Sequence, residues 1–306
     1  MLIYKYSQIS NNHRISYEES IQLCKKSIKM HLGQLKLFFT ELLFLTLCTK
    51  PGDKIIYVGA APGYHITKLA DLFPDINFDL WDPRKFETEE RKNIKLYNDY
   101  FTDTSANSYA QDELNNERLL FICDLRTLKI GEYKKFKDID RMDELVDDDM
   151  IMQKRWCQII KPEYAYLKFR LPYIVPRTEY LSGTIYLQPY TKISTEARLL
   201  TNNYDDNVIY DNIIFQEKMA YHNGYTRCRS KHYNKWKNIM EKYDLINNWD
   251  NALALHIIHF YLKHIKKKNS EEEVGKLFME IIDFHMKKYG NKYNVLFKSK
   301  IIMGEK

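Results

Sequence analysis

Four ionisable residues lie where the predicted secondary structure begins a helix or ends a strand: Lys36, Asp124, Lys168 and Glu196. An ammonium among apolar side chains is costly unless it reaches a carboxylate or water. A neighbouring cation and burial lower the pKa of a lysine, so that its neutral amine can take a proton from a hydroxyl group. Carboxylates beside the two lysines would hold them in place. These residue types therefore predict a general base for a reaction at a hydroxyl oxygen.

A short turn after a buried strand indicates where a second reactant binds. Lys54–Val58 is mostly apolar, as expected for a buried strand, and it leads directly into the small residues Gly59–Gly63. Such a turn lets the backbone approach a ligand closely. Asp82 ends the next predicted strand, where nucleotide-binding α/β folds hydrogen-bond the hydroxyls of a ribose.

The residues of this turn favour S-adenosylmethionine over a dinucleotide. A pyrophosphate needs backbone amides at the start of the helix, which is why dinucleotide folds carry G-x-G-x-x-G. Here Ala61 replaces the second glycine and Pro62 has no amide donor. S-adenosylmethionine has a ribose and an adenine but no phosphate, and methyl transfer from it requires a deprotonated oxygen held in line. A tight strand-to-helix turn without a ligand is the alternative interpretation.

The elements that carry these residues alternate between strands and helices, which predicts an α/β fold. Asp82 and Asp124 then face one crevice, because ligands bind at the carboxyl ends of strands in open sheets. For Lys36, contact with a carboxylate and extension to solvent from the helix start remain open. We predict strands over 54–58, 78–81, 94–97, 119–123, 164–170, 184–189, 196–200 and 213–221. We predict helices over 17–30, with Ser16 and Glu19 as a capping box, and over 33–45, 66–73, 150–160, 252–265 and 274–289, with 129–150 a solvated loop or exposed helix start.

Composition limits the class of protein. Hydrophobic residues make up 44% of the 306 positions, enough for a substantial core, and no apolar run reaches the length of a membrane span. The N-terminus has no signal-peptide pattern, so we expect a cytoplasmic protein. Five scattered cysteines favour reduced thiols and suggest no zinc or other metal site. A formal charge of +6 with 24 tyrosines suits RNA, and the densest basic and aromatic run is 227–237, although a solvated helix face would look the same.

Several motifs together resemble one family, the poxvirus cap-specific mRNA nucleoside-2′-O-methyltransferase that is also the small, processivity subunit of the viral poly(A) polymerase. The resemblance implies a Rossmann-like class I S-adenosylmethionine-dependent methyltransferase fold, with a mostly parallel central sheet and helical extensions at both ends. It also implies 2′-O-methylation of the first transcribed nucleotide of capped mRNA, with the polymerase catalytic subunit as partner, in the host cytoplasm or the virion. The motifs are Gly33–Leu37, Glu41–Leu45, Tyr57–His65, Asp124–Arg126, Leu167–Arg170 and Thr195–Leu200, in order over about residues 15–225.

By that likeness, Lys36, Asp124, Lys168 and Glu196 form a catalytic tetrad in which Lys168 is the base. The resemblance divides the chain into an extension at 1–32 that contributes to the cap site, a methyltransferase core at 33–225 and a basic, helical extension at 226–306 packed on the core. The residues that it implies for S-adenosylmethionine are Tyr57, Gly59, Ala60, Gly63, His65, Asp82, Arg84, Phe101, Asp124 and Arg126.

The cap pocket departs from the family pattern. That pattern stacks 7-methylguanine between two aromatic rings and binds the base edge with two acids. Ile193 stands where one stacking tyrosine is expected, Val175 replaces one acid, and Gln216 aligns with the other; Tyr190 is a candidate for the missing ring. The cap and RNA residues implied are Tyr17, Arg170, Tyr173, Gln216 and Glu217.

Two other functions compete with this interpretation. A non-enzymatic RNA-binding or polymerase-accessory subunit could keep the fold, although the four tetrad residues are all present. A methyltransferase acting on a base nitrogen would usually hold the base with an N/D-P-P-Y-type loop, and Asp124–Thr127 is not one.

Overall fold

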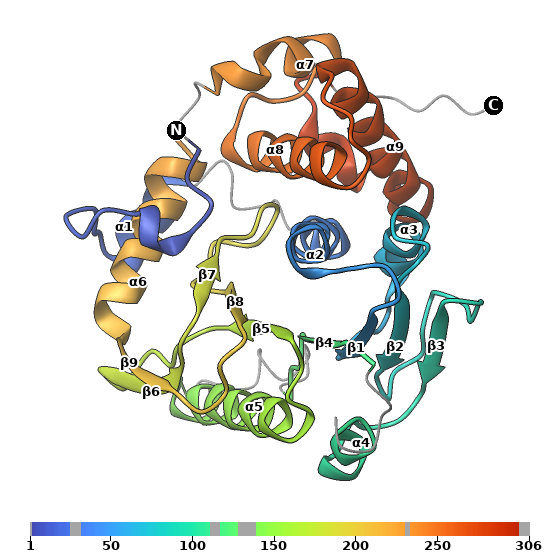
Figure 1. The fold of residues 1–306 in the computed structure, drawn as a ribbon. Helices are drawn as coiled ribbons and strands as arrows, with labels where there is room; N and C mark the ends of the chain where they lie inside the picture. The colour runs from blue at the N-terminus through green and yellow to red at the C-terminus, as the bar shows by residue number, and fades with distance from the viewer. Residues whose placement is uncertain (1, 25–31, 111–116, 128–138, 230–232, 300–306) are drawn as a thin grey trace.

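The computed structural model describes residues 2–24, 32–110, 117–127, 139–229 and 233–299. A seven-stranded sheet in the order β3-β2-β1-β4-β5-β8-β7 forms its centre (Figure 1). A separate two-stranded sheet pairs β6 with β9. The strands are β1 (Lys54–Val58), β2 (Asn77–Trp81), β3 (Ile94–Tyr97), β4 (Leu119–Cys123), β5 (Tyr164–Phe169), β6 (Arg177–Leu181), β7 (Thr184–Tyr186), β8 (Ala197–Thr201) and β9 (Asn207–Asp211).

The direction of β8 decides which residues meet at the edge of the sheet. Strands β1 to β5 run parallel to their neighbours, whereas β8 is antiparallel to both β5 and β7. The start of β8 therefore lies beside the carboxyl end of β5, with Phe169 opposite Ala197 and Lys168 opposite Arg198. Residues just before β8 therefore lie at the same edge of the sheet as residues just after β4 and β5.

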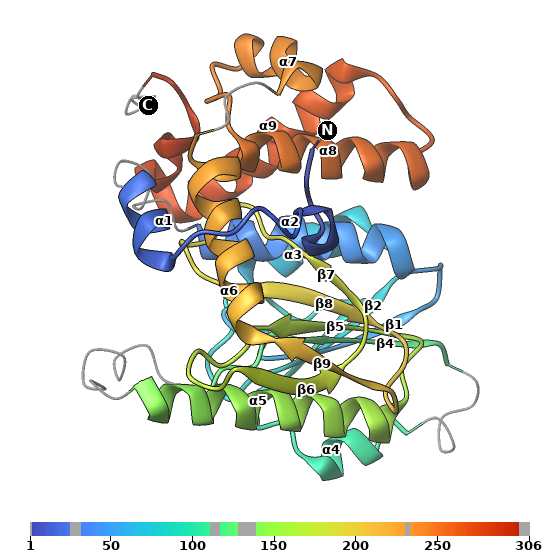
Figure 2. The same cartoon turned by 90° about the vertical axis from the view of Figure 1, so that its left-hand side faces the viewer.

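Helices cover both faces of the sheet. Figures 1 and 2 show α2 and α3 on one face, α4 and α5 on the other, and α8 and α9 as a further layer outside α2. The α-helices are α1 (Tyr17–Leu23), α2 (Gly33–Cys48), α3 (Tyr64–Leu72), α4 (Asp103–Asn107), α5 (Ile139–Ile160), α6 (Asn212–Tyr221), α7 (Lys237–Lys242), α8 (Trp249–His264) and α9 (Glu271–Tyr289). Short 3₁₀ turns are Tyr6–Gln8, Asn234–Trp236 and Gly290–Leu296, and His222–Arg227 forms a π-helical segment.

Helix α2 is the buried helix that its apolar sequence predicts. Every residue from Leu35 to Thr46 is buried, and the helix packs against α8 as well as α3. Its first turn contains Lys36, whose backbone amide donates to the carbonyl of Leu32. The surrounding layers leave this lysine no route to solvent along the helix, because its side chain is only 7% exposed.

The N-terminal part of the chain follows the expected helix start. The Ser16 hydroxyl accepts a hydrogen bond from the amide of Glu19 at 3.1 Å and so caps α1, which is one of the two hydrogen bonds of the predicted capping box. Residues 25–30 of the predicted helix lie outside the described residues. Lys5 forms a β-bridge with Tyr186, so the segment before α1 lies along the outer strand of the sheet.

One prediction of secondary structure is wrong, and one choice that the sequence left open is settled. The stretch 213–221 is helix α6 rather than a strand; the Asp211 carboxylate accepts from the amide of Ile214 at its start, and Phe215 and Met219 are buried one turn apart. For residues 129–150, expected as either a solvated loop or an exposed helix start, the second alternative holds from Ile139, where helix α5 begins.

The expectation of reduced thiols is also wrong for two of the five cysteines. Cys24 and Cys228 form a disulfide across 204 positions of sequence, whereas Cys48, Cys123 and Cys157 are free and buried. The bond joins the end of α1 to the residue after the π-helical segment. Tertiary packing brings these elements together, with the Cβ position of Gly224 only 2.8 Å from the side chain of Leu23.

The strand order and the helical layers confirm the predicted methyltransferase-type α/β fold with N- and C-terminal helical extensions. Within the described ranges, no helix is long and apolar enough to cross a membrane. The same ranges hold no group of three or more His, Cys, Asp or Glu side chains placed to bind a metal ion.

Candidate active site

The four ionisable residues predicted from the sequence meet at the carboxyl edge of the sheet. Asp124 directly follows β4, and its amide donates to the carbonyl of Val58, which extends the β1–β4 pairing by one residue. Lys168 is the penultimate residue of β5, and Glu196 immediately precedes β8. Lys36 reaches the same point from the first turn of α2. We refer to Lys36, Asp124, Lys168 and Glu196 as the tetrad.

Ion pairs connect all four members of the tetrad. The Lys36 Nζ lies 2.6 Å from Glu196 Oε1. The Lys168 Nζ lies between the two carboxylates, 3.4 Å from Asp124 Oδ1 and 3.8 Å from Glu196 Oε2. Of the two explanations left open for Lys36, contact with a carboxylate is therefore the one that holds.

Burial and charge act in opposite directions at these groups. Burial lowers the pKa of Lys36, with smaller contributions from Arg198 and Lys168, while Glu196 and Asp124 oppose that shift. Burial alone would raise the pKa of Glu196 and of Asp124. The surrounding cations outweigh it, so both carboxyl groups have a pKa below the usual range and are ionised at neutral pH.

Two further residues complete the site, and the prediction from sequence did not assign them a role there. Arg198 is 1% exposed, and its Nη2 donates to Asp124 Oδ1 at 2.7 Å. Gln188 links the two acids indirectly: its Oε1 accepts from Arg198 Nε at 3.0 Å, and its Nε2 donates to the Glu196 backbone carbonyl at 3.1 Å. The period of two along a strand puts Arg198 and Glu196 on one face, which is the signal that could have identified Arg198. We found no sequence signal for Gln188.

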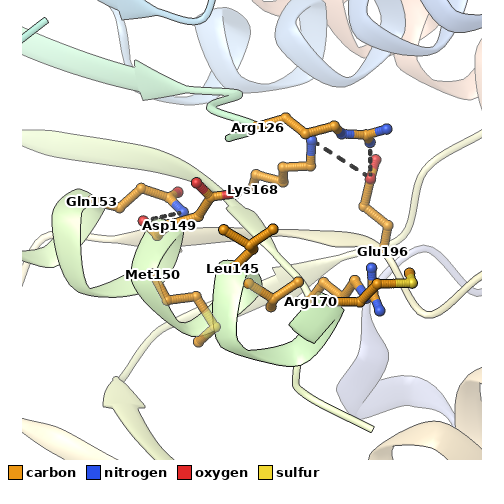
Figure 3. Close-up of a pocket in the computed structure, with 10 residues that line it drawn as sticks. Arg126, Leu145, Asp149, Met150, Gln153, Lys168, Arg170 and Glu196 are labelled. Carbon is orange, nitrogen blue, oxygen red and sulfur yellow. Dashed lines mark hydrogen bonds and ion pairs between the residues drawn. The ribbon is translucent and has the colours of Figure 1, made fainter. Parts of the chain in front are cut away.

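A small cavity lies between the tetrad and α5 (Figure 3). It encloses about 40 Å³, and Lys168, Glu196, Arg126 and Arg170 form its polar side. The Arg126 Nη2 donates to Glu196 Oε2 at 3.1 Å, so this predicted cofactor residue belongs to the tetrad's hydrogen-bond network. Side chains of α5 form the other wall, namely the apolar Met142, Leu145, Val146 and Met150 and the polar Asp149 and Gln153.

The glycine turn after β1 lies against Asp124. Gly59 has φ +77°, and a Cβ atom there would come within 2.8 Å of the Asp124 carbonyl carbon. Gly63 has φ +70°, and its Cβ position lies 3.1 Å from the carbonyl oxygen of Ala60, which is itself buried. Any side chain at either position would strain the turn or collide with backbone, so the turn requires these two glycines.

Asp82 and Arg84 form a compact unit beside this turn. Asp82 Oδ1 accepts from the backbone amide and Nε of Arg84, both at 2.9 Å. Asp82 Oδ2 accepts from Arg84 Nη2 at 2.7 Å and from the amide of Ala61 at 3.1 Å. A carboxylate has about four acceptor positions, so Arg84 and Ala61 occupy them all. The Asp82 side chain is 3% exposed, whereas that of Arg84 is 62% exposed.

Three other predicted cofactor residues are buried by packing. The Tyr57 hydroxyl donates to Glu41 Oε1 at 2.6 Å, and His65 lies between Glu41 Oε2 and Gln34 Oε1, with 2.9 Å to each. The polar atoms of these two side chains thus bind within the protein, where they join α2 to β1 and α3. The Phe101 ring packs edge-on against Trp81 and Trp156.

Three of the predicted cap and RNA residues come together near the tetrad. The Arg170 guanidinium carbon lies 4.4 Å from the centre of the Tyr173 ring, and the Tyr173 hydroxyl accepts from Thr195 Oγ1 at 3.1 Å. Burial raises the pKa of Tyr17, with Tyr173 and Glu18 adding to the shift and Arg170 opposing it. Among the residues that the structure describes, Arg170 Nε and Nη2 have no hydrogen-bond partner, although the Nη2 lies 3.7 Å from Asp143 Oδ1.

The remaining cap residues point elsewhere. Gln216 Nε2 donates to the carbonyls of Pro172 and Tyr173 at 3.4 and 3.3 Å, so it supports the backbone beneath the Tyr173 ring. Glu217 Oε2 lies 3.6 Å from Arg14 Nη1, in an ion pair with that residue. The suggestion that Tyr190 supplies the missing ring is wrong, because Tyr190 is fully buried and its hydroxyl donates to Asn251 Oδ1.

Comparisons with known proteins bear on this site. The family described as Poly A polymerase regulatory subunit matches residues 2–285. The cap-specific mRNA (nucleoside-2′-O-)-methyltransferase of Fowlpox virus (strain NVSL) is 31% identical over 186 residues, which cover 55% of this chain and 57% of that protein. The protein of the same name from Myxoma virus (strain Lausanne) is 30% identical over 207 residues, covering 61% of this chain and 57% of that protein.

A solved structure also aligns, one described as the structure of bluetongue virus VP4 that reveals a multifunctional RNA-capping production-line. Its TM-score is 0.40 at 14% identity, over 58% of this chain and 30% of that chain. The chain studied here spans about 57% of the length of the two viral relatives above. The family match covers nearly all of the chain and confirms the resemblance that the motifs indicated. The chain belongs to the poxvirus family of poly(A) polymerase regulatory subunits and cap-specific mRNA (nucleoside-2′-O-)-methyltransferases.

Proposed function

We propose that this protein transfers a methyl group from S-adenosylmethionine to the ribose 2′-hydroxyl of the first transcribed nucleotide of capped mRNA. The observation that carries the proposal is the position of Lys168, whose amine lies between the carboxylates of Asp124 and Glu196 beside a cavity. A half-buried lysine held at the carboxyl edge of the sheet suits a group that accepts a proton from a hydroxyl.

Each residue of the tetrad has a separate part in this reaction. Lys168 Nζ, as the neutral amine, would take the proton that the 2′-hydroxyl loses when its oxygen bonds to the methyl carbon. Glu196 forms ion pairs with Lys36 and Lys168, and Asp124 forms a second ion pair with Lys168. Arg198 in turn donates a hydrogen bond to Asp124, so the amine of Lys168 is fixed relative to the substrate. When bound, S-adenosylmethionine supplies an electrophilic methyl group on a sulfonium, which needs no further activation by the protein.

The residues at the glycine turn fit this cofactor under one condition. Gly59 has no side chain where the turn approaches Asp124, and Asp82 provides a carboxylate for ribose hydroxyls. Arg84 now occupies three of the four acceptor positions of Asp82. A ribose must therefore displace the Arg84 side chain, which is largely exposed and can turn outward.

The substrate would reach Lys168 along the surface formed by Tyr17, Arg170 and Tyr173. Arg170 Nε and Nη2 have no hydrogen-bond partner in the described residues, and Nη2 makes only the longer 3.7 Å ion pair with Asp143, which suits a phosphate or a base edge. The segment 1–32 contributes Tyr17 to this surface. Ile193 and the exposed Val175 weaken the support for the family's way of holding 7-methylguanine.

A second role, as the processivity subunit of a poly(A) polymerase, is favoured by the family match over residues 2–285. In that role the protein binds the polymerase catalytic subunit and RNA. A protein with the second role alone would increase the length of the poly(A) products made by a purified polymerase catalytic subunit, and it would transfer no methyl groups.

The decisive experiment incubates the protein with radiolabelled S-adenosylmethionine and RNA that is either capped or uncapped, followed by nuclease digestion and identification of the labelled nucleoside. We expect a 2′-O-methylated first nucleotide from capped RNA. A label on a base, or no label at all while polymerase products lengthen, would contradict the proposal of methyl transfer to the ribose.

A further inference from the structure

A groove lined by aromatic side chains lies apart from the tetrad. It encloses about 910 Å³ between the N-terminal segment, the π-helical segment, the turn Asn234–Trp236 and α8. Figures 1 and 2 both show the N-terminus of the chain beside α8. None of the residues that line this groove belongs to the tetrad or lines the cavity beside Lys168. We call it the aromatic groove.

Six of the thirteen residues that line the groove carry a ring, and they come from different elements. Tyr221 and Tyr225 stack with centroids 4.9 Å apart, and they come from α6 and from the π-helical segment. Tyr4 and His256 lie 5.5 Å apart across the N-terminal segment and α8. Each of these four rings is half-buried, so part of its surface faces the groove. Partly exposed rings on a concave surface are suited to stack against nucleic-acid bases.

The charged side chain that lines the groove is the basic Lys235, and Glu19 approaches the groove from outside, where it accepts a hydrogen bond from the Tyr225 hydroxyl at 3.4 Å. No residue that lines it is acidic, and Lys235 lies exposed at its edge, with Nζ 4.7 Å from the centre of the Trp236 ring. Arg229 is exposed nearby, with its guanidinium carbon 5.7 Å from the Tyr225 ring centre. Burial and the neighbouring Lys235 lower the pKa of His256 to about 4, so its ring is neutral at pH 7. Cations at the rim and neutral rings within favour a polyanion with planar bases over a protein surface.

We infer that the aromatic groove binds single-stranded RNA, independently of the nucleotide being methylated and with little preference for sequence. The inference rests on the proposed function only in taking RNA as the ligand, and it needs no methyl transfer. Bases stack on the rings, and the backbone passes Lys235 and Arg229. The groove would hold the body of a transcript whose end lies elsewhere, either at the tetrad or in a polymerase.

Fluorescence anisotropy with a labelled, uncapped oligoadenylate tests the inference. Tyr225→Ala removes a stacking ring and should weaken binding by about 5- to 100-fold, whereas Tyr225→Phe keeps the ring and should bind as the wild type does. Lys235→Glu should weaken binding and lower the magnitude of the log–log salt slope by about 0.7, the value for one phosphate contact on a single strand. Lys92→Glu makes the same charge change at an exposed position beside β3 and should have little effect.

The outcomes separate this inference from the proposed function. Lys168→Met should bind the oligonucleotide normally, so a protein that lacks methyl transfer altogether can still show the loss in Tyr225→Ala. Thermal unfolding of each variant shows whether it is folded. If Tyr225→Ala is unfolded, the comparison of RNA affinity between Lys235→Glu and Lys92→Glu tests the inference instead. Equal affinities for wild type, Tyr225→Ala and Lys235→Glu would overturn the inference. So would loss of binding to a polymerase catalytic subunit with RNA affinity unchanged, which would make the groove a protein interface.

Discussion

The ammonium of Lys36 lies 2.6 Å from the carboxylate of Glu196, and the two side chains are only 7% and 10% exposed. They come from positions 160 residues apart in the sequence. A buried pair of this kind contributes little net stability compared with apolar residues of similar size, but breaking it leaves a charge without compensation. The pair therefore has a measurable signature in stability as well as in activity.

We expect Glu196→Gln to lower the free energy of unfolding by about 3–5 kcal/mol, because it leaves the Lys36 ammonium buried without a charged partner at Glu196. Lys36→Met together with Glu196→Gln should recover part of that loss because both charges are then gone. Neither protein should transfer methyl groups. Denaturant unfolding of the two single variants and the double variant measures the coupling. Strictly additive changes would show that the two side chains do not interact as the distance indicates.

The two carboxyl groups of the tetrad also predict how stability depends on pH. The pKa values of Glu196 and Asp124 lie below their ordinary values of 4.5 and 3.8 in the folded protein, because the surrounding cations outweigh burial. The unfolded chain therefore takes up protons first as the pH falls. Their contribution to stability is complete above about pH 5 and is lost progressively below it. Unfolding measured from pH 7 to pH 3 should decline less steeply in Glu196→Gln than in the wild type; parallel curves would contradict the assignment.

Cofactor binding is expected to depend on Asp82 more than on Arg84. Asp82→Ala should remove two hydrogen bonds to the ribose, each worth about 1.5–3 kcal/mol. Arg84→Ala frees the two acceptor positions of Asp82 that the Arg84 side chain occupies and should retain binding. Asp75→Ala, at an exposed position before β2, is the matched control. Titration calorimetry with S-adenosylmethionine distinguishes these variants, and an unchanged affinity in Asp82→Ala would remove Asp82 from the cofactor site.

The sequence predicted the position of most tetrad residues because the end of an apolar run marks the end of a buried strand. Apolar runs followed by an acid located Asp124 at the edge where the glycine turn lies, and the structure places it there. Arg198 was missed as a site residue because its role depends on the pairing of β8 with β5, which sets it opposite Lys168. Alternation along a strand assigns a face, but it does not give the register against a neighbouring strand.

Errors elsewhere have similar physical causes. The stretch Ile213–Tyr221 mixes apolar and polar residues so that short windows resemble a strand, and the informative signals were the cap at Asp211 and the four-residue spacing of Phe215 and Met219. The partners of a disulfide 204 positions apart depend on how α1 packs against the π-helical segment. Local sequence carries no information on that contact.

The disulfide itself makes a prediction about the N-terminal helix. Because Cys24–Cys228 fixes α1, which carries Tyr17, Cys24→Ser should lower the free energy of unfolding by about 2–4 kcal/mol under oxidising conditions. In a reducing buffer the wild type and Cys24→Ser should unfold alike. Cys48→Ser, at a buried free cysteine, should show no such dependence on redox conditions. Mass spectrometry of unreduced peptides would contradict the assignment if it found both thiols free in air-oxidised protein.

The proposed role of Lys168 as the general base can be tested by replacing its amine. Lys168→Arg keeps a positive charge between Asp124 and Glu196, but a guanidinium does not give up its proton near neutral pH and cannot serve as a base. Turnover should therefore collapse in Lys168→Arg while S-adenosylmethionine still binds. Lys168→Ala should fail as well, with partial recovery on addition of methylamine, which is small enough to enter the space left beside the cavity. Lys161→Arg, at an exposed lysine just before β5, controls for the substitution itself. Normal turnover in Lys168→Arg would leave Lys168 with a positioning role and make Lys36, the other tetrad lysine, the remaining candidate for the base.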